Sequence, residues 1–115
     1  MLVHPSLVDL ASLRSRVRGP VLGPSDDGYD AARRVWNASI DRHPGAVARC
    51  LDAADVAVGV SFARTHELLL AVRGGGHDVG GHGTCDGGLV LDLGPMKGIQ
   101  VDPRHQIARV EPGVV

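Results

Sequence analysis

Aromatic side chains and cysteines are scarce in this chain of 115 residues. Only 3% of the residues are aromatic, so an apolar core has to be built from Val, Leu, Ile and Ala. The two cysteines have different settings, because Cys50 lies in an apolar run and Cys85 in a glycine-rich one. Two such cysteines do not make a disulfide framework, and we expect no disulfide between them.

Charge of one sign and long apolar runs are also missing. A net charge of −1 gives no basic field, and no stretch combines basic residues with stacking aromatics, so nucleic-acid binding is not expected. No run approaches the roughly 18 apolar residues that span a bilayer. The first residues, MLVHPSLVDL, lack the positive start and continuous apolar run of a signal peptide. The sequence therefore predicts a cytoplasmic protein with no membrane partner.

Glycine is abundant and concentrated in one run. The sequence RGGGHDVGGHGTCDGG, from Arg73 to Gly88, holds eight of the 16 glycines. Glycine costs about 0.5–1 kcal/mol relative to alanine inside a helix or strand, so the run is not a regular element. Such backbone can adopt positive φ, approach a ligand closely and turn its N–H groups toward an anion such as phosphate. We interpret the run as a cofactor loop.

The chain before residue 45 predicts two helices. Ser6 resembles an N-cap with Asp9 in the third position, and apolar residues then recur on one face until Gly19-Pro20. These apolar residues are Leu7, Leu10, Leu13 and Val17. A turn-rich segment follows, and Tyr29–Trp36 predicts a short helix whose Tyr and Trp are packing anchors.

The middle of the chain predicts a βαβ unit. Ala46–Leu51 is a strand candidate, and Asp52 can cap a helix in which Val56, Val60 and Ala63 share a face. The apolar run Leu68–Val72 has the length of a strand buried on both faces. The glycine loop leaves directly from this strand, whose carboxyl end is where ligands tend to bind in α/β sheets.

Strand patterns also follow the glycine loop. Leu89–Leu93 predicts a strand, and Ile99–Asp102 with Ile107–Val110 predicts an antiparallel hairpin. The fold class expected from these elements is α+β, with a βαβ unit followed by the glycine-rich loop and antiparallel strands. The chain stops on Gly113-Val114-Val115, just after a strand pattern, and we expect it to be a fragment.

Other kinds of loop fit the glycine run less well. A Walker loop needs a lysine that the run lacks, and a GxGxxG motif fails because Val79 and Asp86 stand at the third glycine position. A metal site would use His77, His82, Cys85 and Asp86, but the spacing His-x4-His-x2-Cys is unlike the close pairs of zinc sites. The metal site and a surface loop without function stay open as weaker alternatives.

Several ordered motifs resemble one family. RGGGH at residues 73–77, Gly80-Gly81, CDGGLVLDL at 85–93, and VDP at 101–103 with ARV at 108–110 are similar to the PCMH-type FAD-binding domain of the berberine-bridge-enzyme-like, FAD-linked oxidases. The upstream segments YDAARRVWNASIDRHPGAVARC and DVAVGVSFAR also look like this family. The resemblance extends over about residues 21–115 and implies that residues 38–115 are part of that domain, preceded by an N-terminal helical segment at 1–37.

The resemblance also implies a site. The FAD pyrophosphate would lie in the loop from Arg73 to Gly81, and His77 would carry a covalent bond to the 8α-methyl of the flavin. The alternative is that His77 is a hydrogen-bonding residue beside non-covalent FAD. No fixed role is expected for His82, and Cys85 is expected to be buried or half-buried. The implied cofactor-binding residues are Arg73, Gly74, Gly75, Gly76, His77, Asp78, Gly80 and Gly81.

The implied function is that of a flavin-dependent oxidoreductase. The whole enzyme would oxidise a small molecule at a C–H next to an alcohol or amine, with molecular oxygen as acceptor. Family members are several times longer, so the catalytic base is expected outside this chain, and the 115 residues alone are expected to be inactive. The competing hypothesis is a non-catalytic, truncated fragment that does not bind FAD tightly.

Overall fold

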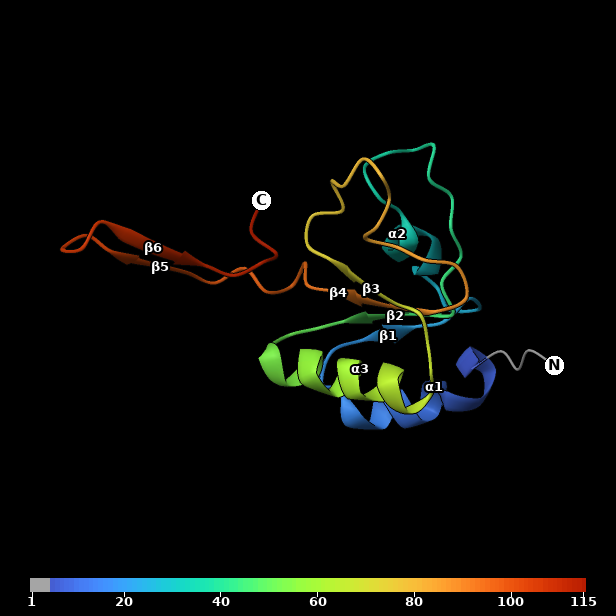
Figure 1. Ribbon diagram of the computed structural model, residues 1–115. Coiled ribbons are helices and arrows are strands. Elements are labelled where there is room, and N and C mark those ends of the chain that lie inside the picture. Colours follow the sequence, from blue (N-terminus) through green and yellow to red (C-terminus); the bar gives the residue numbers. More distant parts are fainter. Residues whose placement is uncertain (1–4) are drawn as a thin grey trace.

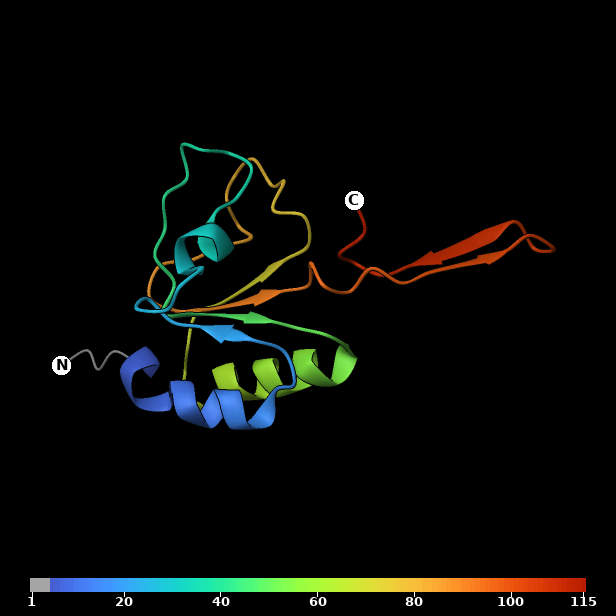
Figure 2. The same cartoon turned by 180° about the vertical axis from the view of Figure 1, so that it is seen from behind.

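The computed structural model describes residues 5–115. It has three layers, and the middle layer is a β-sheet (Figure 1). Helices α1 (Pro5–Arg16) and α3 (Ala53–Thr65) cover one face of the sheet. Helix α2 (Tyr29–Arg33) and the glycine-rich run lie over the other face, as the view from behind also shows (Figure 2). The predicted α+β class is confirmed.

The sheet is mixed and has the order β1-β2-β4-β3. Its strands are β1 (Val21–Leu22), β2 (Ala46–Arg49), β3 (Leu70–Arg73) and β4 (Leu89–Asp92). The pairs β2–β4 and β4–β3 are parallel, and only β1 runs antiparallel to its neighbour. All residues of β4 are buried, and this strand, the last of the four in the sequence, is an inner strand that lies between β2 and β3.

The prediction that Leu68–Val72 is a strand buried on both faces is wrong. Strand β3 lies at the edge of the sheet, where Leu69 is 64% exposed and Val72 48% exposed. The βαβ connection exists, but β4 inserts between its two parallel strands. An apolar run predicts an apolar strand, but it does not predict which strands lie beside it. The sequence pattern therefore could not tell the edge strand β3 from the inner strand β4.

Helix α3 begins as the sequence predicts. The Asp52 carboxylate accepts a hydrogen bond from the N–H of Asp55 at 3.0 Å. The buried face differs from the expected one, because Val60 is exposed whereas Gly59 and Phe62 are buried along with Ala63. A Cβ at Gly59 would overlap the Leu91 side chain of β4, so the glycine lets the helix approach the central strand closely.

The first helix and its connection are tied to α3 by Asp55. This carboxylate is 2% exposed and accepts hydrogen bonds from the N–H groups of Arg18 (2.8 Å), Gly19 (3.0 Å) and Leu51 (3.0 Å). Burial on its own would raise the pKa of Asp55, but these hydrogen bonds outweigh it and leave the pKa lowered. The folded protein therefore contains Asp55 as a charged carboxylate.

Two expectations for the N-terminal part need correction. Helix α1 begins at Pro5, so Ser6 lies in its first turn and is not the cap.

Tyr29 is a packing anchor, because it is buried and its hydroxyl donates to the Pro44 carbonyl at 2.6 Å. Trp36 is not one: it follows α2 and is 69% exposed. Leu13 and Val17 are buried as expected, and the side chains of Leu7 and Asp9 lie outside the described residues.

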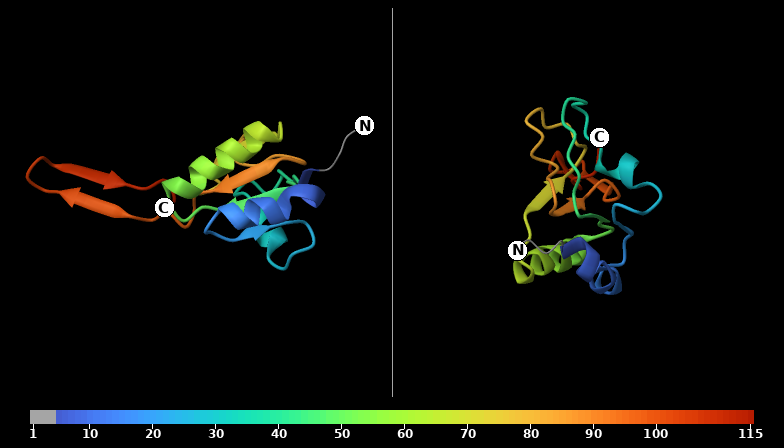
Figure 3. Two further views of the ribbon diagram at one scale, coloured as in Figure 1. Left: turned by 90° about the horizontal axis from the view of Figure 1, so that it is seen from below. Right: turned by 90° about the vertical axis from the view of Figure 1, so that its right-hand side faces the viewer.

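The predicted hairpin is confirmed. Strands β5 (Ile99–Asp102) and β6 (Ile107–Val110) pair antiparallel. Every residue of both strands is exposed, and the hairpin extends away from the layered body (Figure 3). Its register places Ile99, Val101, Ala108 and Val110 on one face, which is therefore wholly apolar.

Candidate functional site

The carboxyl ends of the three parallel strands meet at one edge of the sheet. Arg49, Asp92 and Arg73 end β2, β4 and β3, and they stand directly beside one another in the strand register. The buried Asp92 carboxylate accepts from Arg73 Nη2 at 2.8 Å and from Arg49 Nε at 3.2 Å. Sequence reasoning missed Arg49 and Asp92. The feature that could have identified them is their position, because each is the last residue of its strand.

Arg73 begins the glycine run, but its side chain points into the protein. Its Nη1 donates to the carbonyls of Ala32 (2.6 Å) and Arg34 (2.7 Å), and its side chain is only 11% exposed. The guanidinium thus joins β3 to Asp92 and to the end of α2. It fixes where the loop leaves the sheet, and both of its Nη atoms donate to groups of the protein.

The backbone from Gly74 to Val79 presents free donors. Within residues 5–115, none of the N–H groups in this stretch has an acceptor in the protein. Gly76 has φ +74°, and a Cβ at Gly74 would lie 2.8 Å from the Pro112 carbonyl oxygen. Consecutive free N–H groups on glycine backbone are what an anion such as a diphosphate requires.

Asp78 organises the second half of the loop. Its carboxylate accepts from the N–H groups of His82 (2.8 Å) and Gly80 (3.4 Å) and contacts the His82 ring Nδ1 at 2.8 Å. The hydrogen bonds from the backbone N–H and the ring of His82 hold the pKa of Asp78 low. Gly81, with φ +75°, donates to the Asp78 carbonyl at 3.0 Å. Asp78 therefore shapes the turn through its side chain and its backbone.

His77 is exposed and lies over the glycines. A Cβ at Gly75 would be 2.8 Å from the His77 ring, which places the ring against this part of the loop. In the part of the chain that the structure describes, the ring makes no hydrogen bond or ion pair. His77 thus differs from His82, whose ring is occupied by Asp78.

A segment before β2 holds the loop from its other side. The Trp36 N–H donates to the Gly76 carbonyl at 2.8 Å, and the Asn37 side-chain amide donates to the Val79 carbonyl at 2.9 Å. Arg42 Nη1 donates to the Gly81 carbonyl at 2.7 Å. These contacts bind residues on both sides of the predicted 37/38 boundary to the same loop.

The four residues of the alternative metal site are not brought together. Among residues 5–115, no group of three or more His, Cys, Asp and Glu side chains is arranged to hold a metal ion. Cys85 is buried, as the sequence predicts, and burial raises the pKa of its thiol. Asp86 is exposed and accepts from the His43 N–H at 2.7 Å. Cys50 and Cys85 are both free cysteines in the structure.

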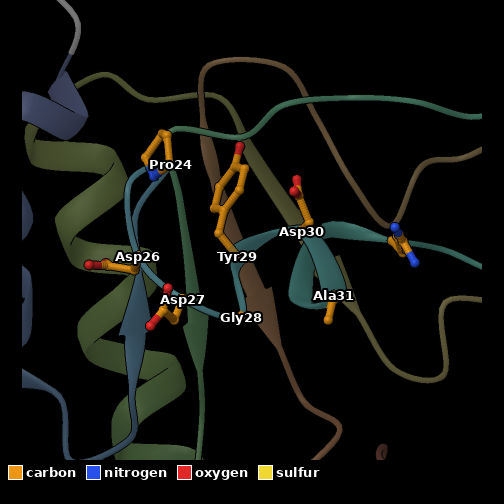
Figure 4. Close-up of a pocket in the computed structure, with 8 residues that line it drawn as sticks. Pro24, Asp26, Asp27, Gly28, Tyr29, Asp30 and Ala31 are labelled. Atoms are coloured by element: carbon orange, nitrogen blue, oxygen red, sulfur yellow. The ribbon is translucent and has the colours of Figure 1, made fainter.

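A separate depression of about 430 Å³ lies beside α2 (Figure 4). Its charged residues are mainly carboxylates, which suit a phosphate ligand poorly. The Tyr29 hydroxyl, which Figure 4 shows at this depression, is already bound to Pro44. The glycine loop is thus the better anion site. The depression is lined by Pro24, Asp26, Asp27, Gly28, Tyr29, Asp30, Ala31 and Arg34.

Comparison with known protein families identifies the class. Residues 44–115 match the model of the FAD binding domain family. The chain therefore belongs to this family, and the predicted resemblance to FAD-linked oxidases is confirmed. No helix within residues 5–115 has the length and apolar character needed to cross a membrane.

Two of the individual relatives are named as oxidases. The chain is 41% identical over 99 residues to (R)-6-hydroxynicotine oxidase of Paenarthrobacter nicotinovorans, covering 86% of this chain and 22% of that protein. It is 30% identical over 89 residues to glucooligosaccharide oxidase of Sarocladium strictum, covering 76% of this chain and 18% of that protein. The chain thus spans about a fifth of the length of these relatives.

Solved structures agree with this assignment. The crystal structure of 6-hydroxy-D-nicotine oxidase from Arthrobacter nicotinovorans matches with a TM-score of 0.83 at 41% identity, covering 86% of this chain and 22% of that one. A berberine-bridge-enzyme-like protein of Physcomitrella patens matches with a TM-score of 0.78 at 25% identity, covering 88% of this chain and 22% of that one. The chain has the mixed α+β fold of these PCMH-type FAD-binding domain neighbours.

Proposed function

We propose that Gly74–Gly76 bind the pyrophosphate of FAD and that the chain is the FAD-binding portion of a flavin-dependent oxidoreductase. The observation that carries the proposal is the row of unpartnered N–H groups that follows β3. The row lies at the carboxyl ends of parallel strands, where α/β sheets bind ligands. Arg73, Asp78, Gly80 and Gly81 complete the site by holding the loop in shape.

We also propose that His77 is the covalent anchor of the flavin. A neutral imidazole is a nucleophile, and the ring of His77 is exposed beside the glycines with no partner among residues 5–115. His82 is the less suitable histidine, because Asp78 binds its Nδ1. The competing role for His77 is a hydrogen bond to FAD that is held without a covalent link.

The reaction we propose is oxidation of a small molecule at a C–H next to an alcohol or amine, with oxygen as the final acceptor. FAD supplies the hydride-accepting chemistry when it is bound, and the residues of this chain supply binding and orientation. One relative is named as an oxidase of a hydroxynicotine and another as an oxidase of a glucooligosaccharide, which supports both substrate classes. No catalytic base is assigned to this chain, and a cytoplasmic location stays a prediction.

Replacing Gly76 with Val is expected to abolish FAD retention. Gly76 has φ +74°, which a β-branched side chain rarely adopts, and a Cβ there would lie 3.3 Å from the Arg73 side chain, so the loop would have to move. Bound FAD is measured after gel filtration of the full product of the reading frame. Gly87→Val is the matched control, because Gly87 has φ +71° and open space around it. Stoichiometric FAD in Gly76→Val would contradict the cradle.

The covalent link is expected on the peptide that contains His77. After denaturation of the same full-length product, flavin mass should remain on this peptide, and His77→Ala should lose it while still binding some FAD through the glycines. His82→Ala serves as the control and should keep the flavin on His77. Peptide mass mapping decides the question. Flavin mass on His82, or on neither histidine, would show that His77 is not the anchor, whereas absence of FAD from every variant would favour the non-catalytic, truncated chain.

A further inference from the structure

We propose that Trp36 belongs to the flavin site and that its indole ring packs against the isoalloxazine end of the cofactor. The inference rests on the proposed function of the glycine loop. It assigns a role to the only tryptophan of the chain, which the sequence pattern treats as a packing residue and which the structure places on the surface.

The backbone of Trp36 is fixed to the proposed cradle. Its N–H donates to the Gly76 carbonyl at 2.8 Å, and the preceding residue, Val35, has its Cα 3.6 Å from the position of a Cβ on Gly76. On either side, the Arg34 carbonyl accepts from Arg73 and the Asn37 amide donates to the Val79 carbonyl. The segment around Trp36 is therefore hydrogen-bonded to the loop at two points.

The side chain of Trp36 is left uncovered by this arrangement. It is 69% exposed, whereas Tyr29 of the same stretch is 5% exposed. Val79, whose carbonyl binds the neighbouring Asn37, is also 66% exposed. The stretch that carries the free N–H groups of Gly74–Val79 is thus accompanied by exposed apolar side chains. A ligand with a charged diphosphate and a flat ring system can bind to the N–H groups through the one and to the apolar side chains through the other.

The position along the loop favours the isoalloxazine over the adenine. Trp36 is bonded to Gly76, which directly precedes His77, the residue proposed to join the flavin ring. An indole can stack on either ring system, so this choice needs a ligand that carries only one of them. FMN carries the isoalloxazine and ADP carries the adenine.

Equilibrium dialysis of the full reading-frame product, with the His77→Ala change throughout to keep binding reversible, tests the proposal. We expect Trp36→Leu to weaken FAD and FMN binding about tenfold, as loss of one stacking contact predicts, and to leave ADP binding unchanged. Trp36→Phe should recover most of the affinity. Ile107→Ala is the control, because Ile107 is 60% exposed on the hairpin and should not affect binding.

A second measurement needs no variant at position 36. Hydroxyl-radical footprinting should show that FMN protects Trp36 from oxidation and that ADP does not, with the hairpin peptide as internal reference. Unchanged FAD affinity in Trp36→Leu, or protection by ADP alone, would overturn the inference and leave the proposed function standing. Failure of the parent protein to bind FAD at all would instead overturn the proposed function, and the inference with it.

Discussion

Leu91→Asp is expected to unfold the domain, whereas Leu69→Asp is expected to leave it folded. Leu91 is fully buried on the central strand β4, beneath Gly59 of α3. The substitution removes about 1.5–3 kcal/mol of apolar burial and places a carboxylate where it has no partner. The combined loss of about 5 kcal/mol or more equals the whole stability of many small domains.

Leu69 provides the matched control, since it is a leucine beside an edge strand. It is 64% exposed, so an aspartate there remains in water and should change the free energy of unfolding by less than about 1 kcal/mol. Urea titrations followed by circular dichroism measure both variants. If Leu69→Asp proved the more damaging, β3 would have to be the central strand and the order β1-β2-β4-β3 would be incorrect.

Arg73→Met is expected to lower the free energy of unfolding by about 3–5 kcal/mol, the cost of breaking a buried ion pair from one side. Asp92, which is 3% exposed, would lose its 2.8 Å partner, and the carbonyls of Ala32 and Arg34 would lose their donor. Because these bonds also fix the start of the glycine loop, FAD binding should weaken in parallel.

Arg49→Met tests whether the effect is specific to Arg73. Arg49 reaches the same Asp92 oxygen at 3.2 Å, but its side chain is 44% exposed, so its contribution should be about 1 kcal/mol or less. Thermal and urea unfolding of the two variants give the comparison. Equal losses in the free energy of unfolding would mean that the Arg–Asp–Arg row acts as a surface network. The buried contacts of Arg73 would then add no stability beyond that of Arg49.

The sequence by itself determined the features that depend on near neighbours in the chain. The cap of α3 needs only Asp52 and the N–H three residues later, and the β5–β6 hairpin needs only two alternating runs and a short turn. The glycine run was predictable as an irregular loop because its composition disfavours helix and strand, and residues 74–88 contain neither. The ordered motifs around it identified the FAD-binding family.

Only the tertiary structure decided the features that depend on pairing between distant segments. Leu68–Val72 and Leu89–Leu93 are similar apolar runs, and what places β4 in the centre is its pairing with β2 on one side and β3 on the other. The direction of Arg73 is set by carbonyls about 40 residues earlier in the chain. The exposure of Trp36 follows from the same long-range contacts, which hold its backbone against Gly76 and leave the indole outside the core. Local pattern carries no information about such contacts, because residues with the same periodicity can meet different partners.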